Sequence, residues 1–127
     1  MPKVISLNQE FKKLKFLPNR KPNISPEEVS ESFSTLDNYQ EGGIFIGHYA
    51  GESEWERHSV GDEIVMAVEG RTTLVMLVNN QEQEYHLNSG ELIVVPQNTW
   101  HRFITKNEVK IMTVTPQPTD HSIEFPE

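Results

Sequence analysis

The chain has 127 residues, of which 35% are hydrophobic, and its formal net charge is −8. This length allows one domain with one core, and the absence of cysteine excludes a disulfide framework and a thiolate site. The negative charge argues against nucleic acid or an anionic membrane surface as a partner, because both are themselves negatively charged.

Residues 1–43 are predicted to form an N-terminal extension made of a strand or turn, a short helix and loops. They begin without the long apolar run of a signal peptide. Since the longest apolar runs elsewhere are only strand-sized, we expect a soluble cytoplasmic protein. Three prolines between Pro18 and Pro26 predict an extended connector. Ser25, followed by a proline and two glutamates, is typical of a helix start, and the weak helix propensity that follows limits this helix to a turn or two.

From Ile44 onward the sequence changes to short β-strands separated by turns. Val, Ile and Thr dominate the apolar segments. The predicted strands are residues 44–50, 63–68, 72–78, 84–87, 91–95, 101–104 and 109–115. A turn at Lys106-Asn107 is expected between the last two of these strands. This pattern predicts an all-β sandwich or barrel over residues 44–115. The Pro-rich, polar residues 116–127 predict an extended C-terminal arm.

The predicted strand at residues 63–68 is apolar on both of its faces. If Glu63 points into the barrel, then Ile64, Met66 and Val68 point outward, because side chains alternate along a strand. An outward apolar row is usually covered by another element or another subunit. We therefore expect a homodimer formed through this face, with residues 1–40 as the alternative cover.

Four side chains at strand ends have the chemistry of metal ligands. Glu56 and His58 are two residues apart, so on a strand they share one face. A tight turn at residues 59–62 then brings Glu63 back beside His58. His101 begins a new strand after a turn that follows Pro96. Glu56, His58, Glu63 and His101 are therefore four candidate ligands, and the spacing of Glu56 and His58 suits one bound ion.

These residues resemble the two sequence motifs of the cupin superfamily, and the chain looks like a small single-domain cupin of the cupin-2 type. The spacing of His58, Glu63 and Gly70 matches the end of the first motif, and that of Gly90, Pro96 and His101 matches the second. The resemblance implies a jelly-roll barrel, the double-stranded β-helix, and a metal held by these positions.

The chain departs from the cupin pattern at two positions that bear on the site. Glu56 stands where the family has its first histidine, and Asn98 replaces a glycine of the second motif. The second change is mild, because Asn tolerates left-handed backbone conformations. For Glu56, one alternative is pairing with Arg57 or Arg102, which would leave three ligands. Another is a chain without metal, since loss of a motif histidine also suits a metal-free relative.

Two imidazoles and two carboxylates without sulfur suit a divalent transition metal, Mn, Fe, Ni or Zn. Two carboxylates neutralise such an ion fully, so we expect a weaker Lewis acid than a three-histidine centre would give. His48, on the strand at residues 44–50, and Phe103, two residues beyond His101, are predicted to line the pocket. His86 and His121 are expected at the surface.

The resemblance leaves two functions open, because cupins include enzymes of many classes and non-enzymes. The first is a metal-dependent enzyme, a dioxygenase, isomerase or lyase, acting on a small oxygen-rich molecule. The alternative is a non-catalytic cupin module that binds a small acid or sugar. A general base near the ion, beyond the ligands themselves, would favour the enzyme.

Overall fold

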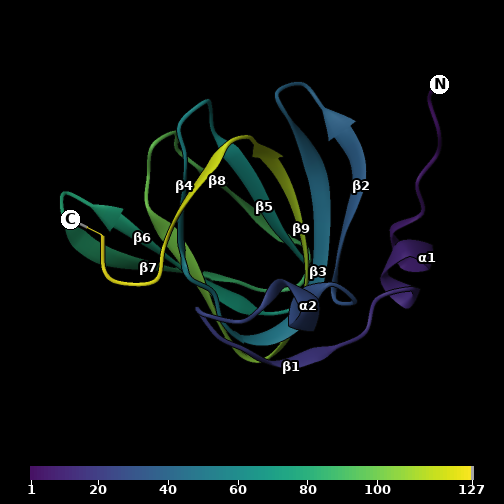
Figure 1. The fold of residues 1–127 in the computed structure, drawn as a ribbon, viewed down its shortest axis with the longest axis horizontal. Coiled ribbons are helices and arrows are strands. Elements are labelled where there is room, and N and C mark those ends of the chain that lie inside the picture. Colours follow the sequence, from purple (N-terminus) through teal and green to yellow (C-terminus); the bar gives the residue numbers. More distant parts are fainter. Residues whose placement is uncertain (127) are drawn as a thin grey trace.

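A computed structural model describes residues 1–126, and it confirms the predicted all-β fold of the jelly-roll type (Figure 1). Each segment predicted to be a strand lies in a strand, with bounds shifted by a few residues, but the last two predicted strands are parts of one strand, β9. The elements in chain order are α1 (Leu7–Lys12), β1 (Leu17–Arg20), α2 (Pro26–Val29), β2 (Phe33–Tyr39), β3 (Gly42–Glu52), β4 (Trp55–His58), β5 (Glu63–Gly70), β6 (Thr72–Val78), β7 (Gln81–Leu87), β8 (Glu91–Val95), β9 (His101–Pro116) and β10 (Thr119–Ser122).

The long strands β3 and β9 organise the barrel. They pair antiparallel along most of their length, from Gly42 opposite Pro116 to Glu52 opposite Ile104. The second half of β9 also pairs with β5, and its first half pairs with β6. β5 continues to β8, and β6 continues to β7. Because β9 takes part in both groups of strands, it connects the two sides of the jelly roll.

The turn predicted at Lys106-Asn107 is wrong, because β9 passes through these residues as one strand. Thr105 pairs with Gly51 and Val109 pairs with Tyr49, so residues 106–108 of β9 lie opposite the single residue between Gly51 and Tyr49. Extra residues in one strand form a bulge, which bends the strand without reversing the chain. The polar residues that suggest a turn therefore occupy an exposed bulge.

The N-terminal extension contains more regular structure than its sequence predicts. Ser25 caps the short helix α2 as expected, accepting a hydrogen bond of 3.3 Å from the Glu28 amide. However, Leu17–Arg20 forms a strand parallel to β3 in spite of Pro18, and residues 33–39 form β2 antiparallel to β3. Proline is tolerated in an edge strand such as β1, because the N–H that it lacks is not needed on the open side.

The core lies inside the barrel and is made by the inward side chains of β3, β5, β6 and β9. Its most buried members include Tyr49, Val65, Leu74 and Val109. A smaller apolar cluster lies outside the sheet, where Phe11 of α1 packs against Leu36 and Ile46. Burial in these two clusters provides the main stabilising contribution to a barrel that has no disulfide.

The outward face of β5 is divided between two environments. Val68 and Met112 pack against the apolar cluster below α1, so the chain's own N-terminal helix covers this part. Ile64 and its neighbours on β8, Leu92 and Val94, remain exposed at 39%, 57% and 49%. The apolar face expected from the sequence is therefore partly covered by residues 1–40 and partly open.

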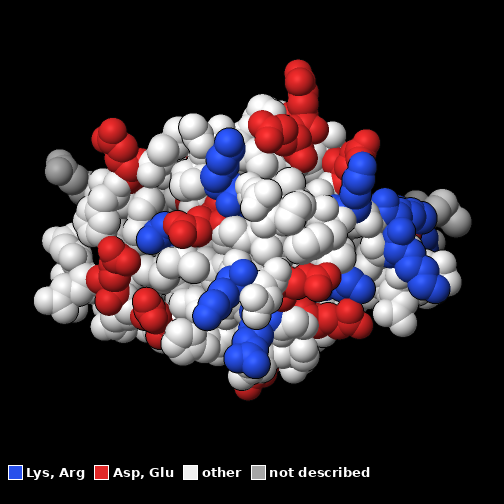
Figure 2. Space-filling model, turned by 90° about the horizontal axis from the view of Figure 1, so that it is seen from below, with Lys and Arg blue, Asp and Glu red and all other residues white. Residues whose placement is uncertain are grey.

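The surface seen from below the barrel carries charges of both signs (Figure 2). Acidic and basic side chains are interspersed on this face, and basic side chains gather at the end where α1 lies. Within residues 1–126, no helix has the length and apolar character needed to cross a membrane.

Candidate metal centre

Two loops place the predicted ligands at one end of the barrel. His58 ends β4, Glu63 begins β5 and His101 begins β9, while Glu56 lies directly opposite His101 in the sheet. Glu56 and His101 are thus neighbours by strand register, and His58 and Glu63 are neighbours by the tight turn between them. Residues from two distant segments of the sequence meet here.

Hydrogen bonds tie the loop at residues 59–62 to the loop at residues 96–100. The backbone and side-chain amides of Gln97 donate to Asp62 Oδ1 and to the Ser59 carbonyl, at 2.8 Å and 2.6 Å. The Asn98 amide donates to the His58 carbonyl at 2.9 Å. Asn98 itself has a φ of 62°, in the left-handed region that Asn tolerates. These bonds hold the two predicted motifs in a fixed relation.

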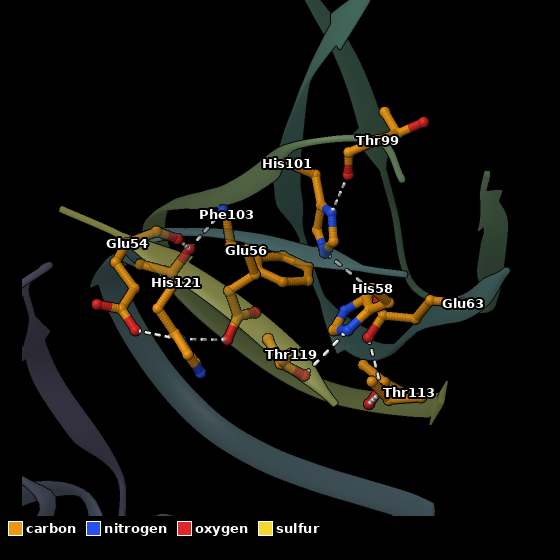
Figure 3. Close-up of polar contacts among 12 residues, drawn as sticks. Glu54, Glu56, His58, Glu63, Thr99, His101, Phe103, Thr113, Thr119 and His121 are labelled. Atoms are coloured by element: carbon orange, nitrogen blue, oxygen red, sulfur yellow. Dashed lines mark hydrogen bonds and ion pairs between the residues drawn. The ribbon is translucent and has the colours of Figure 1, made fainter. Parts of the chain in front are cut away.

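The ligand atoms of the predicted residues converge (Figure 3). Glu56, His58 and His101 each offer a ligand atom, and these three atoms lie within 4.8 Å of one another. Glu63 Oε1 lies 3.0 Å from His101 Nε2 and 3.3 Å from His58 Nε2. His58, Glu63 and His101 are buried, whereas Glu56 is half-buried. The structure thus brings all four predicted residues together.

The other atoms of these side chains are held by hydrogen bonds, which orient the rings. His101 Nδ1 donates to the Thr99 carbonyl at 2.9 Å, and His58 Nδ1 lies 3.0 Å from Thr119 Oγ1. Because the Thr119 hydroxyl donates onward to Gln117 Oε1, its oxygen accepts from His58 Nδ1. In a neutral ring the proton then sits on Nδ1, which leaves the Nε2 lone pair free to bind a cation.

The centre contains three buried acceptor atoms that no donor satisfies. Within residues 1–126, His58 Nε2, His101 Nε2 and Glu63 Oε1 have no hydrogen-bond partner of good geometry, although they face one another. Three mutually facing lone pairs repel unless a cation lies among them, and an unsatisfied buried polar atom is costly. The donor set of nitrogen and carboxylate oxygen is the one that divalent transition metals prefer. The residues therefore fit a metal ion.

A proton takes the place of that cation when no metal is bound. Burial alone would raise the pKa of Glu63, but the contacts with His101 and His58 outweigh it and lower that pKa to about 2. Burial likewise opposes a charge on His101, yet contact with Glu63 and the bond to Thr99 raise the pKa of this histidine. The contacts in the metal-free centre therefore favour an ion pair of a carboxylate and an imidazolium.

Glu56 is not engaged by either of the arginines that the sequence offers as alternative partners. Arg57 pairs with Asp120 at 3.0 Å, and Arg102 pairs with Glu52 at 3.0 Å. Glu56 instead faces His121, whose Nδ1 lies 3.7 Å from Glu56 Oε2. Glu56 therefore remains available to the centre.

The cavity next to the centre has a volume of about 400 Å³. Phe103 lines it as expected, together with Ile111, Thr113 and Thr115 of β9. His48 does not line it, because the imidazole turns outward to pair with Glu108 and to contact Phe16. The alternation of side chains along β3 explains this orientation, because the next residue, Tyr49, points inward and His48 therefore points outward.

Several cavity residues are not found by the sequence argument. Thr119 and His121 reach the site because β10 pairs with β4, which sets Thr119 opposite His58 and His121 opposite Glu56. Arg20 reaches it from β1. No local signal marks these three residues. Thr115 could have been found by alternation along β9, and its hydroxyl donates to Glu63 Oε2 at 2.6 Å.

Comparisons with known proteins agree with this geometry. The family model of the cupin domain matches residues 45–115, whereas no curated protein matches the chain. A solved cupin-2 domain protein from Shewanella frigidimarina is 23% identical with a TM-score of 0.67, and the match covers 90% of this chain and 95% of that one.

Two other solved structures show the same fold at lower identity. A protein from Neisseria meningitidis is 18% identical with a TM-score of 0.66, covering 91% of this chain and 100% of that one. Hydroquinone 1,2-dioxygenase from a Sphingomonas species, solved with 4-hydroxybenzoate bound, is 15% identical with a TM-score of 0.58, covering 80% and 70%. With the family match spanning more than half of its residues, this chain belongs to the cupin family.

Proposed function

We propose that this protein is a small metal-dependent enzyme that acts on a small, oxygen-containing molecule. The observation that carries the proposal is the set of three buried, unsatisfied acceptor atoms, His58 Nε2, His101 Nε2 and Glu63 Oε1. Glu56 lies within reach of both histidines. The adjoining cavity has the size of sites that hold small ligands.

The four residues would hold Mn, Fe, Ni or Zn, and a bound ion of this kind supplies a Lewis acid that polarises a substrate carbonyl or enolate oxygen. The chain's own residues prepare the site for it. Thr99 and Thr119 fix the imidazole tautomers, and the Thr115 hydroxyl holds Glu63 in place. These groups keep the ligand atoms in position before metal binds, which lowers the cost of ordering them.

His121 supports the enzyme over a purely binding module. It lines the cavity, and its imidazole contacts Glu54 and faces Glu56. A histidine beside a carboxylate at the edge of a metal centre can take a proton from a substrate. One of the structures with a similar fold is a dioxygenase, so this fold is compatible with catalysis in another protein.

Metal analysis of the purified protein tests the proposal. We expect about one equivalent of a transition metal per chain in the wild type, because four ligands of this kind bind such ions tightly. His101→Ala should lose it, whereas His86→Ala, which changes an exposed histidine outside the cavity, should retain it. Wild type purified without chelator and carrying less than about a tenth of an equivalent would contradict the proposal.

Assay of the metal-loaded protein then separates the enzyme from the binding module. We expect turnover or oxygen uptake with a small acid or phenol. We expect His101→Ala to abolish this activity. Saturable binding of such molecules without turnover would favour the non-catalytic cupin.

A further inference from the structure

The side chain of Arg20 is positively charged and lines the same cavity. Arg20 extends from β1, and its guanidinium carbon lies 4.9 Å from the Phe33 ring centre and 4.6 Å from that of Tyr49. The two rings are themselves stacked, with their centroids 5.5 Å apart. Stacking on aromatic faces holds a guanidinium in a defined orientation while leaving its N–H donors free.

Within residues 1–126, no carboxylate pairs with Arg20 to balance its charge. Among residues 1–126, the ion pairs of Arg57 and Arg102 are formed with Asp120 and Glu52, and no ion pair includes Arg20. This arginine is thus a fixed donor in a partly enclosed site, where a charge is worth more than in open water.

The Tyr49 hydroxyl provides a second donor beside Arg20. The side chain is 1% exposed and lines the cavity. Its hydroxyl lies near Arg20 and Thr105, and it has no partner of good hydrogen-bond geometry within the described part of the chain. Burial raises the pKa of Tyr49 to about 12, although the charge of Arg20 partly opposes the shift. The phenol therefore stays protonated and can donate to an acceptor from a ligand.

The remaining walls of the cavity define the other properties of that ligand. Phe45, Phe103 and Ile111 give it an apolar lining, which suits an apolar body. Glu56 and Glu63 also border it, so the cavity disfavours a ligand that carries more than one negative charge. A carboxylate matches the single free guanidinium, whereas a doubly charged phosphate would be repelled by the two glutamates.

We propose that Arg20 and Tyr49 form a carboxylate-binding subsite, so that the molecule bound in this cavity is a small monocarboxylic acid with an apolar body. This inference rests on the proposed function only in placing the acid in the cavity that adjoins the metal centre. The carboxylate is held at the Arg20 subsite, and the rest of the molecule lies along the apolar wall.

Binding of 4-hydroxybenzoate tests the subsite, with 4-hydroxybenzamide and phenyl phosphate as matched probes. Calorimetry on metal-free and on Mn²⁺-loaded protein should show the acid bound at least about tenfold more tightly than the amide, because charge-assisted hydrogen bonds are the stronger ones. Arg20→Gln should remove this preference by weakening the acid about tenfold or more, with the amide changed by less than about threefold. Arg71→Gln, an exposed arginine outside the cavity, should behave as wild type.

Two further variants keep the test decisive if Arg20→Gln unfolds. Arg20→Lys retains the charge but loses the planar fork, so it should bind the acid with intermediate affinity. Tyr49→Phe removes only the hydroxyl and should weaken the acid several-fold, while the amide changes less. Circular dichroism of each variant reports whether the fold is retained.

The inference is overturned if wild type binds acid and amide equally, or binds no acid at millimolar concentration. It also fails if folded Arg20→Gln binds the acid as wild type does, or if phenyl phosphate binds more tightly than the acid. The preference for acid over amide is tested on both metal-free and Mn²⁺-loaded protein, and the comparison with phosphate is made on metal-free protein, where Glu56 and Glu63 are not neutralised by an ion. If the protein binds metal but its affinity for the acid does not depend on Arg20, the subsite alone is refuted. If the acid binds through Arg20 in a protein that takes up no metal, only the proposed metal centre is refuted.

Discussion

The buried ion pair at the centre of the site predicts a specific pH dependence of stability in the metal-free protein. Contacts with His101 and His58 lower the pKa of Glu63 from 4.5 to about 2. A carboxyl with a lowered folded-state pKa stabilises the fold above its unfolded pKa, and this contribution is lost as the pH falls through the folded value. The free energy of unfolding should therefore decrease between pH 4.5 and pH 2 through Glu63 alone.

The size of the effect follows from the shift. A difference of about 2.5 pKa units corresponds to about 3 kcal/mol at 1.36 kcal/mol per unit. By pH 3, which is 1.5 units below the unfolded pKa, about 2 kcal/mol of this should already be lost. Since Glu63 is only 4% exposed, solvent screening reduces the figure little.

Glu63→Gln removes the titrating carboxyl together with its contact to His101, and it leaves the other carboxylates unchanged. Urea unfolding of both proteins, in the presence of a chelator and at half-unit steps from pH 7 to pH 3, gives the two stability profiles. The difference between wild type and variant should shrink by about 2 kcal/mol from pH 6 to pH 3. Parallel profiles over this range would refute the ion pair.

The same pair predicts the behaviour of His101 at higher pH. The contacts with Glu63 and Thr99 raise the pKa of His101, so its protonated form stabilises the metal-free fold below the unfolded pKa of about 6.5. This contribution is lost as the pH rises through the folded value. Because a metal displaces the same proton, metal affinity should increase with pH over this window.

Three further predictions concern the metal centre and the surface. In a chelator competition, Glu56→Gln should weaken metal binding and Glu56→His should retain it, because an amide oxygen is a poorer ligand than a carboxylate or an imidazole. Equal metal affinity in wild type and both variants would show that Glu56 is not a ligand. Thr119→Val should lower metal affinity about tenfold to a hundredfold, because His58 loses the partner of its Nδ1, and an unchanged affinity would show that the hydroxyl does not orient the ring. Light scattering should give about twice the chain mass of 14.6 kDa, since the exposed apolar side chains on β5 and β8 suit a second copy. Val94→Asp should shift the protein to the monomer, and a monomeric wild type would contradict the dimer.

Most strands between residues 44 and 115 and the four candidate ligands could be inferred from the sequence alone, whereas β1, β2 and β10 could not. Alternation of apolar residues and the turns between them are local features, and the barrel follows from them because each strand has one face that must be buried. His58 and Glu63 could be brought together by reasoning alone, since a four-residue turn separates them. His101 was within reach only because Gly90, Pro96 and His101 carry a recognisable spacing.

The other side chains that reach the centre could not be inferred from the sequence. Thr119 and His121 arrive through the pairing of β10 with β4, and Arg20 arrives through the parallel pairing of β1 with β3. These pairings join segments far apart in the chain, and their register depends on the burial of whole faces rather than on local propensity.

The same reason explains the errors at His48 and at the bulge of β9. A one-residue difference in alternation turns a side chain from the cavity to the outer face, so His48 and Tyr49 exchange roles. Polar residues at positions 106–108 indicate a break in the strand, but whether the chain reverses or bends there is set by the partners on both sides, β3, β5 and β6. The sequence specifies the components of the site, and the long-range pairing of the strands determines how they are arranged.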